Sequence, residues 1–325
     1  MRARAVACAN IALAKYWGKS DTRLNLPAVP SLSLTLAELQ TTTTVEFDNV
    51  LERDSFVLNG ADAPTKATVR ATLLLDRVRT LAGTRTRARI ESSNNFPTAS
   101  GLASSASGFA ALASAATRAA GLSLSDSDVS ALARASSASA ARSVFAGFVE
   151  LPAGSPGDAS LSARPFVDAS HFDVRMVVAV TAEHEKDVGS TDGMEVSRTT
   201  SPYYAAWLHA APSLFAEVCA GIREKNIVRA GEAMEKSTWA MHACALASSP
   251  SIRYFQSATA NALDTIRSLR ALKNIPVYAT MDAGPHVKAL CLSADAEVVA
   301  KALTETAGVL RTLIASPGPG ITVDV

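Results

Sequence analysis

The order of apolar and polar side chains along the chain predicts an alternation of strands and helices. Residues 3–9 are apolar apart from Arg4, and residues 31–36 alternate Ser or Thr with Leu, which are the patterns of buried and half-buried strands. Residues 65–82 place apolar side chains at helical spacing and end at Gly83. Further strands are predicted at residues 41–47, 55–59, 87–92, 144–151, 172–181, 275–280 and 287–292, and further helices at 109–121, 202–224, 226–247, 251–272 and 295–308. Mixed helices and strands of this kind indicate an α/β fold.

A loop rich in Pro, Gly and Ser, residues 151–160, separates the two halves of this pattern. The chain of 325 residues is longer than one average domain. We therefore expect two lobes, residues 1–170 and residues 171–325.

Composition and charge narrow the class of protein. Hydrophobic residues make up 48% and charged residues 19% of the chain, which supports a sizeable core and excludes a mainly disordered protein. A formal net charge of +1 gives no global electrostatic attraction for nucleic acid. The four cysteines form no C-x-x-C pair, and we find neither a signal-peptide core nor a run of ~18 apolar residues. These features favour a cytoplasmic protein that spans no membrane.

The segment 97–108, PTASGLASSASG, is the most unusual part of the chain. Its Gly, Ser and Ala residues follow a predicted strand and lead into an apolar helix. A phosphate group needs close approach of backbone N–H groups at a helix N-terminus, which small residues permit. The segment is no Walker A loop, because no G-K-[ST] follows. On composition alone, a phosphate-binding loop and a tightly packed helix of small residues are equal alternatives.

Three charged side chains are candidates for chemistry. Lys15 follows an apolar run, where an ammonium is costly unless it is paired, so an anion site competes with an exposed strand end. Asp282 stands just past a strand and before Gly284, where loops present catalytic groups, although an ordinary turn is the commoner reason. Arg142 lies among small polar residues that suit bidentate anion recognition, or it is a helix-surface arginine.

Some other polar and aromatic residues have less specific interpretations. The small polar segment 189–194 is predicted to be a turn. His242, Trp207 and Trp239 are predicted core side chains, and Glu235 is predicted to lie on a solvated helix face.

Taken together, these segments resemble one family, the diphosphomevalonate (mevalonate diphosphate) decarboxylases of the GHMP kinase superfamily. The segments occur in the family's order and extend over most of the chain. They are ANIALAKYWGK (9–19), LNLPAVPSLSLTL (24–36), SNNFPTASGLASSASGFAAL (93–112), ARSVFAGFVE (141–150), GSTDGM (189–194), TSPYYAAW (200–207), AMHA (240–243) and MDAGPHVK (281–288).

The resemblance implies an activity, a fold and an assembly. The activity is the ATP- and Mg²⁺-dependent decarboxylation of (R)-5-diphosphomevalonate to isopentenyl diphosphate, with ADP, phosphate and CO₂ released, in the mevalonate pathway of isoprenoid biosynthesis. The implied fold is the two-lobe α+β fold of GHMP kinases, with an N-terminal lobe similar to ribosomal protein S5 domain 2 and a C-terminal ferredoxin-like lobe. The implied assembly is a homodimer.

The resemblance also implies roles for individual residues. Asp282 matches the family's catalytic aspartate, which takes or orients the proton of the substrate's 3-hydroxyl, and Lys15 matches the lysine beside it. Arg142 matches the arginine that holds the substrate carboxylate. Other substrate-binding positions are matched by Tyr16, Lys19, Ser139 and Ser190. Nucleotide-binding positions are matched by Asn94, Pro97, Ser100, Gly101, Leu102, Ala103, Ser104 and Ser105, of which Ser104 and Ser105 are also the expected Mg²⁺ ligands.

The sequence departs from the family's pattern near the substrate site. The family usually has a G-S-G-S run before the arginine, whereas Ser136 and Ala138 replace the two glycines here, and Leu151 stands where the family often has Trp. Added side chains narrow the backbone conformations and add bulk. The alternatives are a 5-phosphomevalonate decarboxylase or a mevalonate 3-kinase of the same family. An alternative of a different class is an inactive GHMP-like ligand sensor, which would be expected to lack Asp282 or the loop serines.

Overall fold

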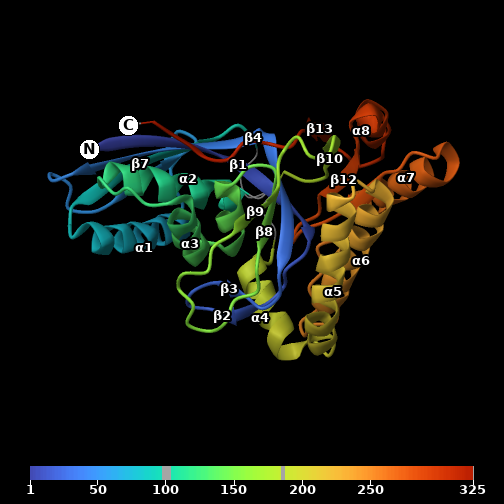
Figure 1. Ribbon diagram of the computed structural model, residues 1–325, viewed down its shortest axis with the longest axis horizontal. Coiled ribbons are helices and arrows are strands. Elements are labelled where there is room, and N and C mark those ends of the chain that lie inside the picture. Colours follow the sequence, from blue (N-terminus) through green and yellow to red (C-terminus); the bar gives the residue numbers. More distant parts are fainter. Residues whose placement is uncertain (97–103, 184–186, 325) are drawn as a thin grey trace.

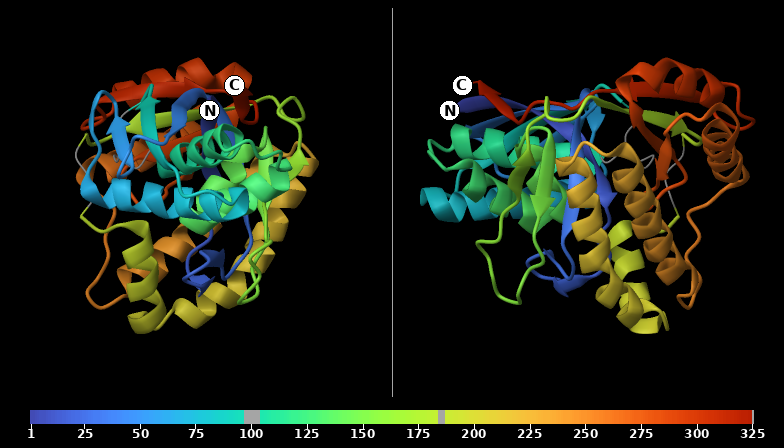
Figure 2. Two further views of the ribbon diagram at one scale, coloured as in Figure 1. Left: turned by 90° about the vertical axis from the view of Figure 1, so that its left-hand side faces the viewer. Right: turned by 45° about the vertical axis from the view of Figure 1, so that its right-hand side comes forward.

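The computed structural model describes residues 1–96, 104–183 and 187–324, which form two β-sheets that are each covered by helices (Figure 1). The first sheet has eight strands, the second has four, and a small third sheet joins β2 (Lys19–Asp21) to β3 (Leu26–Pro27). The two larger sheets lie side by side, and the chain termini lie together at the far edge of the first (Figures 1 and 2). The α/β fold predicted from the sequence is confirmed.

The first sheet runs in the order β14-β1-β4-β7-β5-β6, and β8 and β9 extend it beside β4. Its strands are β1 (Arg2–Ala14), β4 (Ser31–Asp48), β5 (Ser55–Leu58), β6 (Ala61–Asp62), β7 (Arg87–Asn94), β8 (Phe148–Leu151), β9 (Arg164–Val167) and β14 (Thr322–Asp324). Helices α1 (Thr65–Ala82), α2 (Ser104–Ala119) and α3 (Asp126–Ser136) cover one face, and a 3₁₀ segment, η1 (Ala138–Val144), links α3 to β8. The buried side of α2 is mostly alanine, which lets the helix lie close to β1 and β4.

Strand β4 is one long strand where the sequence predicts two, residues 31–36 and 41–47. Residues 31–36 are buried on both faces, whereas buried and half-buried residues alternate over 41–47. The register with β1 shifts between Cys8 and Asn10, opposite the polar stretch that the sequence pattern takes for a break. The change in pattern therefore marks the point where β4 passes from burial on both faces to burial on one face, not the end of a strand.

The second sheet is antiparallel in the order β11-β12-β10-β13. Its strands are β10 (Val174–Val180), β11 (Tyr278–Thr280), β12 (Val287–Leu292) and β13 (Arg311–Ala315), and its helices are α5 (Tyr204–Arg223), α6 (Ile227–Leu246), α7 (Ser257–Lys273) and α8 (Ala296–Thr304), with a 3₁₀ turn η2 (Ser293–Asp295). Alternate residues of β10 contact different helices. Met176 and Val178 pack with α5 and α6, and Val177 and Ala179 pack with α7 and α8.

One hydrophobic core joins the two larger sheets. Ile11 and Leu34 of the first sheet share a buried cluster with Val178 of the second sheet and Ile222 of α5. The last strand, β14, also returns to the first sheet, where Asp324 pairs with Arg4 of β1. The division of the chain at residues 170 and 171 stays a prediction.

The structure also differs from the sequence predictions at α3, which the sequence pattern does not predict, at the segment 189–194 and at Trp239. The segment 189–194, predicted as a turn, is the start of a helix, α4 (Ser190–Thr200), whose buried Met194 and Ser197 fix it to the structure. Trp239, predicted as core, is 47% exposed on α6.

By length and composition α5 is apolar enough to cross a membrane. It packs along α6 and buries Trp207 and Ile222.

Candidate active site

Lys15 and Asp282 form a close ion pair between the two sheets. Lys15 directly follows β1, and Asp282 follows β11 by two residues. The Lys15 Nζ lies 2.5 Å from Asp282 Oδ1 and donates a second hydrogen bond to the Ala12 carbonyl at 2.9 Å. The Thr280 hydroxyl donates to the same carbonyl at 3.2 Å, so the two strand ends are fixed to each other. The Lys15 side chain is 2% exposed and that of Asp282 is 28% exposed, so only the carboxylate is open to a substrate.

A second lysine, which sequence reasoning missed, holds the other oxygen of the same carboxylate. Lys288 Nζ lies 3.3 Å from Asp282 Oδ2, and its side chain is fully buried. Burial alone would raise the pKa of Asp282, but the attraction of Lys15 and Lys288 outweighs it and holds this pKa well below its usual range. Asp282 is therefore an ionised carboxylate between two ammonium groups.

Burial has the opposite sign for a cation. It lowers the pKa of Lys15 from 10.5 to about 8, and the neighbouring charge of Asp282 offsets only part of that change. The positive charges of Lys288 and Arg142 lower it further. The site therefore contains an ammonium that loses its proton in mildly alkaline solution.

Two interactions that the sequence does not reveal support the loop that carries Asp282. Glu235, predicted to be solvated, accepts the backbone N–H of Ala279 at 2.8 Å and a hydrogen bond from Arg270 at 3.0 Å. His242 is buried as predicted, makes a hydrogen bond with the backbone of Met281, and lies with its ring 4.7 Å from that of Phe255 at an angle of 40°. Burial lowers the pKa of His242 to about 3, so this imidazole is neutral at physiological pH.

Arg142 is a buried arginine of η1 whose guanidinium is held by two serines of β4. Its Nε donates to Ser33 Oγ at 2.9 Å and its Nη1 donates to Ser31 Oγ at 2.7 Å. The guanidinium carbon lies 5.9 Å from the centre of the Tyr16 ring. Burial lowers the pKa of Arg142 to about 10, so the side chain stays charged. The Ser-Leu alternation of residues 31–36 thus places hydroxyls toward this arginine and leucines in the core.

Lys19 lies at the start of β2, where three elements meet. Its Nζ donates to Asn25 Oδ1 at 2.6 Å and lies 3.4 Å from Thr191 Oγ1 of α4. Asn25 has a left-handed backbone, with φ of +52°, and donates from its side chain to the Ala135 carbonyl at the end of α3. Ser190 is the first residue of α4, so the positive end of this helix lies beside Lys19 (Figure 1).

Arg70 of α1 is a further cation that sequence reasoning missed. It donates to the Ser136 carbonyl at 2.9 Å, and its guanidinium stacks at 4.4 Å on Phe109 of α2. It is close enough to Lys19 to lower the pKa of that side chain, although burial is the larger cause. Two cations beside a helix N-terminus make a suitable environment for a multiply charged anion.

The substitutions in the segment 136–139 cause no backbone strain. Among the described residues, positive φ outside glycine occurs only at Asn25, Asn59, Lys225 and Asn274, so Ser136 and Ala138 adopt ordinary conformations. Ser139 makes two hydrogen bonds in this segment. Its carbonyl accepts from the Asn10 side-chain amide at 3.0 Å, and its hydroxyl lies 3.2 Å from that of Ser137.

The two departures from the family's pattern at positions 138 and 151 meet in one place. Ala138 and Leu151 belong to the same small buried cluster, against which the Tyr16 ring packs. A methyl group at 138 and a smaller side chain at 151 thus change the same packed volume in opposite directions.

The predicted nucleotide-binding residues are only partly described. Pro97, Ser100, Gly101, Leu102 and Ala103 lie outside the described residues. Ser104 and Ser105 begin α2, whose N-terminus can receive phosphate groups. Asn94 ends β7, and its side-chain oxygen accepts from Thr41 Oγ1 at 2.6 Å, which in turn pairs with Ser107 of α2 at 2.7 Å.

The residues present fit a magnesium ion that is carried by a nucleotide. Within residues 1–96, 104–183 and 187–324, no group of three or more His, Cys, Asp or Glu could hold a metal. Mg²⁺ typically takes most of its ligands from phosphates and water, with one or two protein oxygens. Hydroxyls of Ser104 and Ser105 at a phosphate-binding helix end suit that ligand set.

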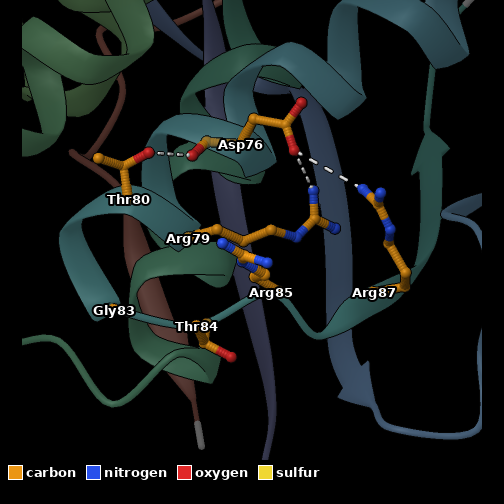
Figure 3. A pocket seen from close by; sticks show the side chains of 7 residues that line it. All are labelled: Asp76, Arg79, Thr80, Gly83, Thr84, Arg85 and Arg87. Carbon is orange, nitrogen blue, oxygen red and sulfur yellow. Dashed lines mark hydrogen bonds and ion pairs between the residues drawn. The ribbon is translucent and has the colours of Figure 1, made fainter.

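A pocket on the surface lies at the opposite end of α1 from Arg70. It is lined by Asp76, Arg79, Thr80, Gly83, Thr84, Arg85 and Arg87 (Figure 3). Arg79 is paired with Asp54 and Asp76, and Arg87 lies 3.7 Å from Asp76. These interactions neutralise much of the positive charge within the protein, so the pocket has the character of a structural ion cluster.

Comparison with known proteins identifies both halves of the chain. The diphosphomevalonate decarboxylase-like N-terminal domain matches residues 7–163, and the mevalonate 5-diphosphate decarboxylase C-terminal domain matches residues 176–313. The diphosphomevalonate decarboxylase of Homo sapiens is 35% identical over 305 residues, which are 87% of this chain and 75% of the human protein.

Solved structures agree over the whole length. Mevalonate diphosphate decarboxylase from Staphylococcus aureus has a TM-score of 0.94 at 38% identity and covers 100% of this chain and 98% of its own. A structure of MDDEF in complex with MVAPP, AMPPCP and magnesium has a TM-score of 0.93 at 39% identity and covers 100% and 99%. This likeness confirms the two-lobe GHMP kinase fold expected from the sequence. By its two matched domains, its relatives and its architecture, the chain belongs to the diphosphomevalonate decarboxylase family.

Proposed function

We propose that the protein decarboxylates 5-diphosphomevalonate at the expense of ATP, giving isopentenyl diphosphate, ADP, phosphate and CO₂. The observation that carries the proposal is the ionised Asp282 held against Lys15, with Arg142 close enough to affect the pKa of Lys15. A catalytically silent sensor would have no need of a carboxylate held in this way. The family to which the chain belongs has the same activity in its name.

In the first step, the tertiary 3-hydroxyl of the substrate attacks the γ-phosphorus of ATP. An O–P bond forms to the substrate, the bond to ADP breaks, and the hydroxyl proton moves to Asp282. The partly exposed carboxylate can accept the hydrogen bond of that hydroxyl and so orient it. Transfer of the phosphoryl group itself depends mainly on position and charge stabilisation, which Lys15 and the N-terminus of α2 can supply. Bound Mg²⁺ would neutralise the phosphate charge that develops.

In the second step, the 3-phosphate leaves while the bond to the substrate carboxylate breaks. The electron pair of that C–C bond becomes the new double bond, and CO₂ is released. Arg142 has donors left after its two bonds to Ser31 and Ser33, so it can hold the carboxylate in line with the leaving phosphate.

The 5-diphosphate end of the substrate is proposed to lie where Lys19 and Arg70 approach the start of α4. Tyr16, Ser139 and Ser190 are the further candidates for this end of the substrate. The support is local geometry, since Lys19 reaches Thr191 of α4 and Arg70 reaches the Ser136 carbonyl. A diphosphate carries more charge than a monophosphate and gains more from two cations.

Product analysis with three substrates tests the proposal. The purified protein is given ATP and Mg²⁺ with mevalonate, 5-phosphomevalonate or 5-diphosphomevalonate, and CO₂, ADP and the isoprenoid product are measured. We expect kcat/KM for CO₂ release to be at least ~10-fold higher for the diphosphate than for the monophosphate, since one charge-assisted hydrogen bond can contribute about 1.5–3 kcal/mol. A ratio near one or below would favour a monophosphate decarboxylase, and ADP without CO₂ would favour a 3-kinase.

We further propose that the protein works as a cytoplasmic homodimer with no nucleic-acid or membrane partner. The support is the family resemblance, the formal net charge of +1 and the scattered cysteines, all four of which are buried. Light scattering during size-exclusion chromatography tests the dimer, and a mass of one chain would contradict it.

A further inference from the structure

Lys288 is a charged residue in the middle of a hydrophobic strand. It stands between Val287 and Ala289 in β12, and all three are fully buried. A buried ammonium costs several kcal/mol unless it is paired and hydrogen-bonded. The cost indicates that Lys288 makes a specific interaction, and its ammonium lies 3.3 Å from the Oδ2 atom of Asp282.

The sheet determines where this lysine points. Lys288 lies opposite Thr280 in the β11–β12 pair, and Asp282 follows Thr280 by two residues in the connecting turn. The turn is closed by a backbone hydrogen bond from Gly284 to the Asp282 carbonyl at 2.8 Å. Lys288 and Asp282 therefore belong to one hairpin, whereas Lys15 reaches the same carboxylate from the end of β1.

The two lysines hold different oxygens of the carboxylate. Lys15 binds Oδ1 and Lys288 binds Oδ2, so rotation of the carboxylate about its last bond would break both interactions. Oδ1 is held by Lys15 at the end of the first sheet's β1, and Oδ2 is held by Lys288 from β12 of the second sheet. The carboxylate is thus fixed in orientation as well as in charge.

We propose that Lys288 is a positioning residue for the reaction, which binds Asp282 Oδ2 so that the carboxylate turns a fixed edge toward the substrate's 3-hydroxyl. The role of Asp282 as acceptor of the 3-hydroxyl rests on the proposed function. The pairing of Lys288 with Asp282 does not depend on it. The same pairing accounts in part for the low pKa of Asp282. The other charged or titratable groups that face this carboxylate are Lys15, Tyr16, Arg142 and His242.

A simpler interpretation is that Lys288 only stabilises the fold. The two interpretations differ in what they predict for kcat at a fixed neutral pH. If Lys288 positions Asp282, its removal lowers kcat with little change in KM for ATP, and an arginine at the same position restores part of kcat. If it only stabilises the fold, the variant melts at a lower temperature and keeps the kcat of the wild type while it is folded.

The test compares Lys288→Met with Lys288→Arg and with Leu290→Ala, a matched control two residues along β12 whose buried side chain belongs to the hydrophobic core. We expect the kcat of the Met variant to fall ~10-fold or more through misplacement of the carboxylate, with little change in KM for ATP. The Arg variant should recover part of that loss, and Leu290→Ala should lose stability while keeping its kcat. An unchanged kcat in folded Lys288→Met would overturn the proposal.

A second measurement needs no activity. Thermal unfolding of Lys288→Met, Asp282→Asn and the double variant gives the coupling between the two side chains. We expect the double variant to be more stable than the sum of the single losses predicts, because each single variant leaves one buried charge with a partner removed. Additive losses would show that the pairing is absent. If wild-type protein releases no CO₂ from any substrate while this coupling is present, the proposed function fails and the pairing of Lys288 stands.

Discussion

At the scale of the residue, the site depends on charged side chains whose pKa values the protein shifts by different amounts. Asp282 is held ionised far into acid by two ammonium groups, whereas Lys15 has a pKa of about 8 because it is buried. Arg142 keeps its charge throughout. The carboxylate and the guanidinium thus stay charged over the physiological range, and Lys15 is the group most sensitive to alkali.

Replacement of Asp282 by Asn should abolish most turnover. The amide has the size of the carboxylate but cannot accept the hydroxyl proton, and it removes the negative charge between Lys15 and Lys288. Loss of a general base typically costs ~10²-fold or more in kcat. Steady-state CO₂ release measures the effect, and binding of a fluorescent ATP analogue serves as the control, since that binding should persist. A variant that kept most of its kcat would show that Asp282 is not the hydroxyl acceptor.

The pKa of Lys15 predicts opposite effects of alkali on activity and on stability. Between about pH 8 and 10.5 the folded protein loses the Lys15 proton while the unfolded chain still holds it. The unfolded state then binds more protons, so the contribution of Lys15 to the free energy of unfolding rises with pH over this window. Activity should fall over the same window, as the ammonium beside Asp282 is lost. The check is kcat/KM and melting temperature measured together from pH 7 to 10, and a decline of both in parallel would assign the loss of activity to unfolding.

At the scale of the element, the short β2–β3 segment depends on one glycine. Gly18 has φ of +106°, and a Cβ there would overlap the Tyr204 hydroxyl of α5. Its carbonyl accepts from Ala28, which closes the segment that carries Lys19 and Asn25. The position of the Lys19 ammonium is therefore fixed by backbone conformation and by contact with the C-terminal helices.

Replacement of Gly18 by Ala should both destabilise the protein and weaken substrate binding. The backbone strain costs ~1–3 kcal/mol, and displacement of Tyr204 adds to it. We expect KM for 5-diphosphomevalonate to rise several-fold as Lys19 moves, with little change in ATP affinity. Gly60→Ala is the matched control, because Gly60 also has positive φ, +82°, but its Cβ would meet open space. Equal effects of the two substitutions on KM would refute the role of the Gly18 contact.

Elements with strong local signals were predictable from the sequence. The helix predicted at residues 65–82 coincides with α1, whose C-terminal Gly83 adopts φ of +64°. The sequence missed α4 because its start reads as a turn, and it divided β4 because the strand changes environment along its length. These boundaries are determined by tertiary packing, which periodicity does not contain.

The contrast between local sequence signals and tertiary packing also explains which site residues the sequence predicts. Lys15 is predictable because its charge follows an apolar run, and Arg142 because it lies among small polar residues, and the structure brings Asp282 to Lys15. Lys288 gives a signal like that of Lys15, since it stands between Val287 and Ala289. Arg70 carries no such signal, since it lies on an ordinary amphipathic helix and reaches the site only through the packing of α1 against α2 and α3.

At the scale of the whole molecule, the site is built from both sheets, so it requires that they stay together. The Lys15–Asp282 ion pair and the hydrogen bond from Trp207 to the Trp17 carbonyl, at 2.7 Å, both cross between the N-terminal and C-terminal parts. Beneath them the shared hydrophobic core is continuous from Leu34 to Val178 and Ile222. A core of this kind favours one cooperative unit, although chains of this length often unfold in several steps.

We therefore predict a single unfolding transition. Far-UV circular dichroism follows all helices and strands, whereas tryptophan fluorescence reports on Trp17 and Trp207 in the contacts between the two parts, and on Trp239 beside Phe255 of the C-terminal part. In urea, the two signals should give the same midpoint. Leu34→Ala should lower both midpoints together, because Leu34 is fully buried in the shared core and a Leu to Ala change there costs ~2–5 kcal/mol. If the fluorescence transition preceded the loss of circular dichroism, the two lobes would separate before they unfold, and the site would be lost in a protein whose lobes are still folded.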